Sequence, residues 1–82
     1  MIDLSNTVSP QLELPPASDD WSADNRAGHC YADRIVGAMR EKEAPIYLAQ
    51  VVENLIAASR YDGVTVGFFH RIAEYAIGAH RV

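Results

Sequence analysis

Three histidines and a single cysteine are the side chains in this sequence best suited to bind a metal ion. His29 and Asp33 are four residues apart, about one turn of a helix, so both could face the same ion. The neighbouring Cys30 would point about 100° away from His29 on a helix. Structural zinc sites usually pair their ligands in two short motifs, and no second pair follows around His70 or His80. The sequence therefore predicts no metal site and no cofactor.

The same side chains offer only isolated catalytic pairings. Cys30 with a histidine would make a nucleophile and its base, and His70 with Glu53 or Glu74 would make an acid–base pair. No surrounding pattern supports either pair, and the glycines lack the spacing of a phosphate-binding loop. As the only cysteine, Cys30 cannot form an internal disulfide, and we expect it to be a small buried apolar residue. We predict that the protein is not an enzyme.

The elements that position these residues are helices. Apolar residues recur at helical spacing in three segments, and we expect helices at residues 23–41, 45–59 and 66–80. Ser22 and Thr65 are the expected N-caps of the first and third helices, and Pro45 suits the first turn of the second. The short connection before Pro45 makes the first two helices antiparallel neighbours. The predicted fold is all-α, a small three-helix domain over residues 21–82.

Residues 1–20 differ from the rest of the chain. They hold three of the four prolines, so we expect an extended or disordered segment. Two apolar–acid–apolar triplets occur there, "IDL" at 2–4 and "LEL" at 12–14, and the outer residues of each would point the same way in an extended chain. Such a triplet could dock in a groove or pair with a sheet edge. The other interpretation is an unstructured tail, and the sequence leaves both open.

Charge is distributed unevenly along the chain. Residues 1–20 hold four acidic and no basic residues, whereas residues 21–82 hold seven of each, which together give the net charge of −4. The helical part is therefore neutral and lacks the basic surface that nucleic-acid binding usually needs. No apolar run approaches the roughly 18 residues of a membrane span, and the N-terminus does not resemble a signal peptide. We expect a cytoplasmic protein with no membrane partner.

Two features indicate a protein partner. The segment 45–59 is apolar around most of its circumference, more than two neighbouring helices would cover. Phe68 and Phe69 are adjacent on the third expected helix, so one of them must point away from the core. We predict a small regulator or inhibitor that binds a protein, itself included, as a homodimer. The predicted contacts are Tyr47, Val51, Phe68 and Tyr75.

The alternative function is DNA binding. Residues 58–72 resemble the helix-turn-helix motif of bacterial DNA-binding regulators, in which small and apolar residues keep fixed distances from a turn glycine. The matching residues are Ala58, Ser59, Gly63, Val64, Phe69 and Ile72. The resemblance implies a recognition helix whose DNA contacts would be Thr65, His70 and Arg71. The sequence departs from the motif at Asp62, and the outer face near the start of that helix has few of the basic side chains that DNA contacts need.

Overall fold

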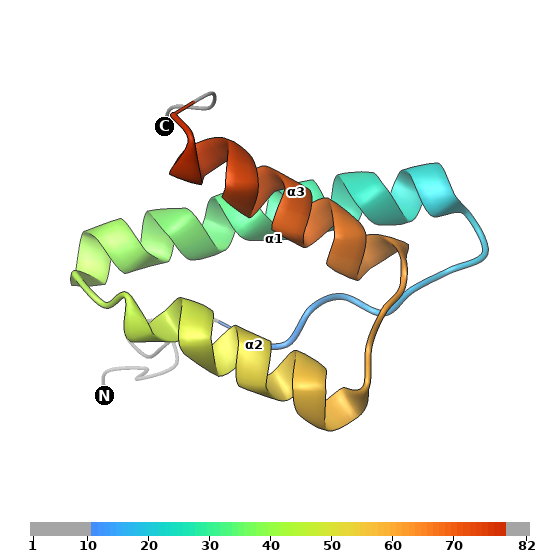
Figure 1. Cartoon of the computed structure of the whole chain (residues 1–82), viewed down its shortest axis with the longest axis horizontal. Helices are drawn as coiled ribbons and strands as arrows, with labels where there is room; N and C mark the ends of the chain where they lie inside the picture. Colours follow the sequence, from blue (N-terminus) through green and yellow to red (C-terminus); the bar gives the residue numbers. More distant parts are fainter. Residues whose placement is uncertain (1–10, 79–82) are drawn as a thin grey trace, which may run out of the picture.

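Three helices follow one another in the computed structural model, which describes residues 11–78: α1 (Trp21–Lys42), α2 (Ile46–Ala58) and α3 (Gly63–Ala76) (Figure 1). The predicted all-α, three-helix fold is confirmed, and α2 runs antiparallel to α1. Within the described residues, no helix combines the length and apolar character needed to cross a lipid bilayer.

The N-caps of α1 and α3 are aspartates, which corrects the expected helix starts. Asp20, and not Ser22, accepts a hydrogen bond from the backbone amide three residues ahead, at 3.1 Å. Asp62 caps α3 by accepting from two backbone amides, whereas Thr65 lies inside the first turn. Gly63 is consequently the first residue of α3. A carboxylate at a helix N-terminus satisfies free amides and also opposes the helix dipole, so it displaces a nearby hydroxyl as the cap.

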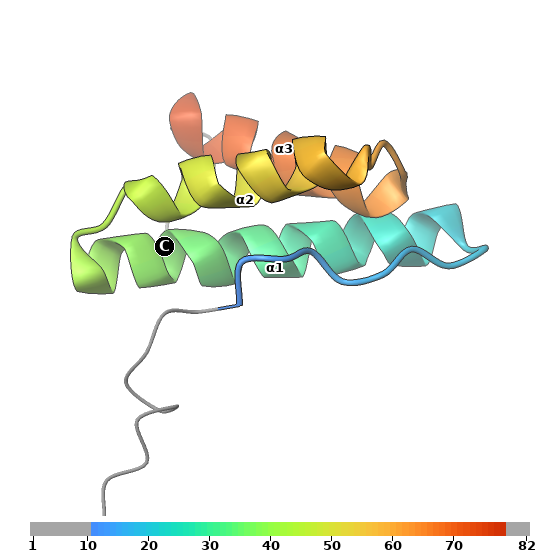
Figure 2. The same cartoon turned by 90° about the horizontal axis from the view of Figure 1, so that it is seen from below.

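Alpha-helices α2 and α3 lie on the same side of α1 (Figure 2). The closest packing is between α1 and α3, and two glycines permit it. A Cβ atom added to Gly28 would lie 2.2 Å from the carbonyl oxygen of Val64, and one added to Gly67 would lie 2.2 Å from that of Asn25. Only hydrogen fits at these positions, so the two backbones come into direct contact.

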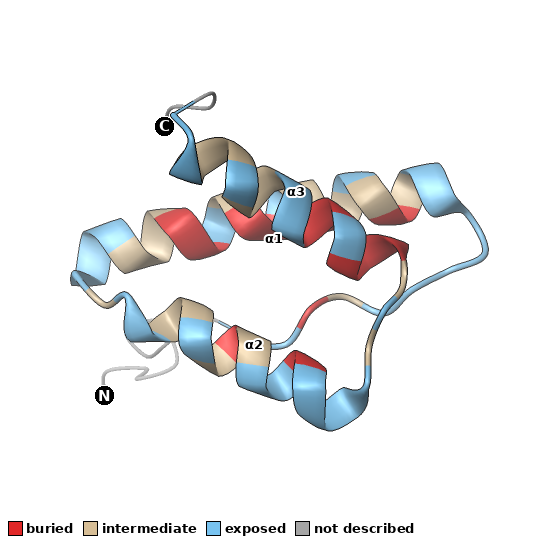
Figure 3. Ribbon diagram, viewed as in Figure 1, coloured by how far each residue is buried: buried red, intermediate tan, exposed pale blue. Residues whose placement is uncertain are grey.

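The core is built by all three helices and by one residue that precedes them. Most buried residues lie on the inward sides of the helices (Figure 3). The core cluster consists of Leu14, Tyr31, Ala32, Ile35, Val51, Leu55, Val64 and Phe68. The expectation for Cys30 was wrong, because its side chain is exposed. The buried stripe of α1 passes through the next residue, Tyr31, and a cysteine one position earlier on the helix points away from it.

The segment 11–20 is extended and packs against the helices, which decides the question that the sequence left open for these residues. Leu14 is only 6% exposed, and Leu12 packs against the same core cluster, while Glu13 between them faces solvent. The alternation expected of the "LEL" triplet is therefore present. The "IDL" triplet lies in residues 1–10, outside the described part of the chain.

Candidate interaction surfaces

The four predicted contact residues fall into two groups. Val51 and Phe68 have no solvent exposure and belong to the core, which corrects their assignment as contacts. A side chain with no exposed surface cannot touch a partner while the fold stays intact, so both hold the helices together. Tyr47 is half-buried near the start of α2, and Tyr75 is half-buried on α3. The sequence could not separate the two groups, because the buried and the exposed face of an apolar helix carry the same residue types.

A polar cluster fixes the second half of α3 to α1. The Tyr75 hydroxyl donates a hydrogen bond to Oδ1 of Asp33 at 2.6 Å, and burial together with this bond raises the pKa of Tyr75. The Arg40 guanidinium lies 5.8 Å from the centre of the same ring. Arg71 pairs with Asp33 at 3.7 Å and with Glu74 at 3.2 Å. Tyr75 and Arg71 therefore join two helices of the same chain.

Two histidines stack beside this cluster. The rings of His29 on α1 and His70 on α3 are 5.4 Å apart between centres and inclined by 25°. Nε2 of His29 is buried and has no hydrogen-bond partner among residues 11–78. Burial, followed by the charges of Arg71 and His70, lowers the pKa of His29. In the described part of the chain, no three histidine, cysteine, aspartate or glutamate side chains lie close enough to hold a metal ion.

The candidate DNA contacts are placed poorly for reading a duplex. Thr65 is 7% exposed within the first turn of α3. Arg71 is largely covered and engaged with Asp33 and Glu74, and only His70 projects into solvent. The positions of α3 that do face outward carry mainly apolar side chains. DNA binding stays a prediction, and no contact in the described residues favours it over a protein partner.

The outward side of α3 carries an apolar stripe. Val66, Phe69 and Ala73 are all exposed and follow one another at spacings of three and four residues, so they share one face. This face is opposite Gly67, the point of contact with α1. The Phe69 ring packs edge-on against Phe68 at 5.2 Å between centres and remains 42% exposed. The prediction that one phenylalanine points outward is confirmed.

A matching stripe runs along α2. Only Val51 and Leu55 of this helix are buried. Ala49 and Ile56 are exposed, Val52 is half-buried, and the three share a face at helical spacing. The opposite side carries Asn54, which bonds the extended segment beside α1. The α2 stripe therefore points away from the extended segment and the α3 stripe away from α1, and we treat them together as one candidate surface. We call this surface the outer apolar face, defined by Ala49, Val52, Ile56, Val66, Phe69 and Ala73.

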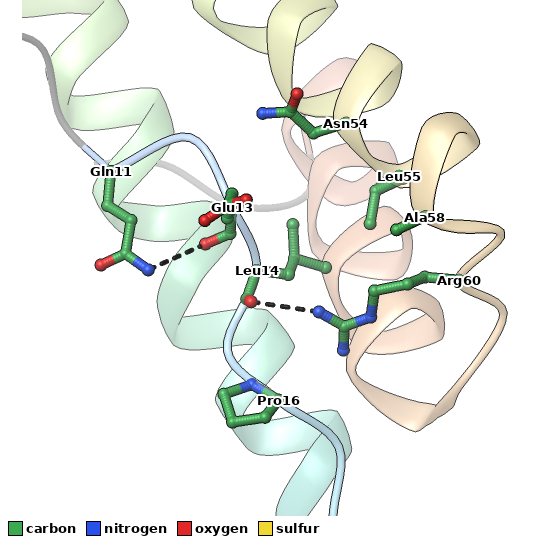
Figure 4. Close-up of a pocket in the computed structure, with 8 residues that line it drawn as sticks. All are labelled: Gln11, Glu13, Leu14, Pro16, Asn54, Leu55, Ala58 and Arg60. Carbon is green, nitrogen blue, oxygen red and sulfur yellow. Dashed lines mark hydrogen bonds between the residues drawn. The ribbon is translucent and has the colours of Figure 1, made fainter.

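A second surface is the groove between α1 and α2 that holds residues 11–16. Its side chains bind the backbone of the segment. Asn54 donates to the carbonyl of Leu12 at 2.9 Å, and Arg60 donates to the carbonyls of Leu14 and Pro15 at 3.0 and 2.8 Å. Figure 4 shows the Leu14 side chain directed toward Leu55, between the segment and α2.

Tyr31 completes the groove from α1. Its hydroxyl donates to the carbonyl of Gln11, and burial raises the pKa of Tyr31 to about 12. Like any tyrosine phenol, it is protonated at neutral pH and serves as a donor. The sequence singled out the "LEL" triplet but gave no sign of Tyr31, Asn54 or Arg60 as its partners. Every residue has a backbone carbonyl, so a hydrogen bond to that group cannot be predicted from the type of residue that accepts it.

Comparison with protein-family models, curated proteins and solved structures gives no match for this chain. Its function is therefore inferred from its own residues.

Proposed function

We propose that this chain is a small non-enzymatic protein-interaction module of the cytoplasm, a regulator or inhibitor that self-associates through the outer apolar face. The observation that carries the proposal is the exposure of large apolar side chains along α2 and α3. Ile56 is 68% exposed, Val66 46% and Phe69 42%. Apolar side chains exposed together on a protein surface are typical of interaction sites.

The chemistry of the face favours a second copy as the partner. The outward sides of α2 and α3 carry one acidic residue, Glu53, and one histidine, His70. A surface with so little charge gives no electrostatic selectivity for a strongly charged partner. A twofold arrangement would bury the same apolar side chains from both copies, as the interfaces of most homodimers do. The exposed thiol of Cys30 agrees with a reducing compartment, where free cysteines persist.

The test is the mass of the full chain in solution as a function of concentration, by sedimentation equilibrium. We expect a dimer that Ile56→Glu or Phe69→Glu weakens at least tenfold, because each places a charge in the middle of the apolar contact. Tyr61→Glu is the matched control. Tyr61 is 84% exposed but lies in the turn between α2 and α3, so its substitution should leave the dissociation constant unchanged.

A monomer at all concentrations, or equal weakening by all three substitutions, would contradict self-association through this face. Fluorescence anisotropy with duplex DNA at low salt tests the alternative on the same samples. Duplex binding that weakens with salt and is reduced by Arg71→Ala would favour the helix-turn-helix function instead.

A further inference from the structure

The segment 11–16 is held in a way that does not depend on its belonging to the same chain. Four hydrogen bonds to backbone carbonyls fix it, donated by Tyr31, Asn54 and Arg60. The side-chain anchor is Leu14, which enters the core, with Leu12 packed beside it. These groups would make the same contacts with a segment that arrived from another molecule.

The fit around the segment leaves space on both sides. A hollow of about 340 Å³ opens beside it on the side of α2, lined in part by Asn54, Leu55 and Arg60. A second hollow of about 250 Å³ lies toward α1, lined in part by Tyr31 and Ile35. The segment is therefore anchored at Leu14 and by its carbonyls but is not enclosed.

The link between the segment and α1 determines whether the segment can reach the groove of its own chain or that of another chain. Residues 17–20 are exposed, and the chain reverses direction there through a clamp between Ser18 and Asp24. The Ser18 hydroxyl donates to Asp24 at 2.7 Å, and its backbone amide donates to both carboxylate oxygens at 3.0 and 3.1 Å. Asp24 is only 6% exposed. Opening this clamp would free an extended arm that carries the anchor residues.

We infer that the groove between α1 and α2 is a peptide-binding site whose partner is the segment 11–16 of a second copy of this chain. Two copies exchange their arms, and each Leu14 enters the core of the other molecule. Exchange of an identical element replaces every lost contact with an equivalent one, so its cost is low. Pro15 and Pro16 favour an extended arm before it binds, which reduces the entropy lost on docking. This inference is independent of the outer apolar face.

A complementation experiment tests the exchange. One full-length chain carries Leu14→Asp, which removes the anchor and leaves the groove. The other carries Asn54→Ala and Arg60→Ala, which weaken the groove and leave the arm. In an equimolar mixture each chain can supply what the other lacks. Both chains also carry Ile56→Glu, which disrupts the outer apolar face. We expect light scattering after gel filtration to show a complex of twice the 9.0 kDa chain mass that neither variant forms alone.

The comparison of mixture with single variants also separates this inference from the proposed function. Association through the outer apolar face is weakened equally in every sample, because each chain carries Ile56→Glu, and only arm exchange is specific to the mixture. Glu13→Gln in place of Leu14→Asp is the matched control. Glu13 is exposed, so the Glu13→Gln chain should form the same amount of complex in the mixture as a chain with the wild-type segment. Helical circular dichroism of each variant verifies that it is folded.

A second variant keeps the inference testable if Leu14→Asp does not fold. Asp24→Ala opens the clamp and leaves both arm and groove intact. We expect it to raise the fraction of arm-exchanged dimer at least fivefold over wild type, and the addition of Arg60→Ala should reverse that rise. No complex in the mixture and no rise with Asp24→Ala would overturn the inference. The inference would also be overturned if the Leu14→Asp chain bound a synthetic peptide of residues 11–20 but formed no complex with the chain that carries Asn54→Ala and Arg60→Ala.

Discussion

The imidazole of His29 lies where its charged form is unfavourable. Burial is the largest cause, followed by Arg71 and then by the stacked His70, and together they outweigh Glu74 and Asp33 and lower its pKa below 6.5. A histidine whose pKa is lower in the folded than in the unfolded chain leaves stability unaffected above the unfolded pKa. Below that pH the unfolded chain takes up the proton first, so the folded state loses stability as the pH falls.

We therefore predict that the free energy of unfolding is constant from pH 7.5 to about 6.5 and declines between 6.5 and 5.5, before most carboxylates titrate. His29→Gln should remove most of this decline, because glutamine has no charge to gain. Urea denaturation at three pH values measures it. His70→Gln is the control. It removes only a lesser cause of the shift, so most of the decline should persist. Equal declines in wild type and His29→Gln would show that other groups control stability in this range.

At the scale of elements, the contact between α1 and α3 depends on two positions without a side chain. We predict that Gly67→Ala destabilises the protein by about 1–3 kcal/mol, the usual cost of inserting atoms into a packed site, because the new Cβ would meet the carbonyl oxygen of Asn25 at 2.2 Å. A backbone atom cannot rotate aside as a side chain can. Chemical denaturation of the full chain measures the change.

Gly37→Ala on α1 is the control for this substitution. Nothing lies within 4 Å of a Cβ added to Gly37, so alanine there should stabilise the helix by about 0.5–1 kcal/mol through its lower backbone entropy in the unfolded chain. If Gly67→Ala were also neutral or stabilising, the close approach of the two backbones would not be a feature of the protein in solution.

The elements themselves were largely predictable from the sequence, and their ends were less so. Helical spacing identified three helices, but it left open which of Phe68 and Phe69 is buried. The caps were missed because Asp20 and Asp62 each stand near a hydroxyl residue with similar propensity, and the choice depends on which side chain reaches the free amides. Burial was hardest to predict on α2, where apolar residues occupy both faces and only packing separates Val51 from Ile56.

For the whole molecule, the sequence indicated that two neighbouring helices could not bury all the apolar side chains of α2. It did not indicate which other residues would bury them. The outer faces of α2 and α3 stay open, and the inner side of α2 is covered partly by Leu14, 37 positions before Val51 in the chain. Such a contact depends on the path of the extended segment. That path is set by Arg60, Asn54 and the clamp at Asp24, whose roles no local pattern reveals.

This arrangement makes α2 the helix that should unfold locally at the lowest free energy. It contributes only two buried residues, Val51 and Leu55, and the described residues show no backbone packing between α2 and α3. Regions with few buried apolar contacts open at lower free energy than the rest of a protein. We predict that hydrogen exchange of the full chain shows the amides of α2 exchanging faster than those in the middle of α1 and α3.

Leu14→Ala should widen this difference. Loss of a buried leucine costs about 2–5 kcal/mol, and because Leu14 packs in the core beside Leu55, the loss should fall mainly on the opening of α2. The exchange of α2 should then accelerate far more than that of α1 and α3. Glu13→Ala, one residue away but exposed, should change neither. Uniform acceleration of all three helices would instead mean that α2 unfolds only together with the other two, and that the extended segment stabilises the molecule as a single cooperative unit.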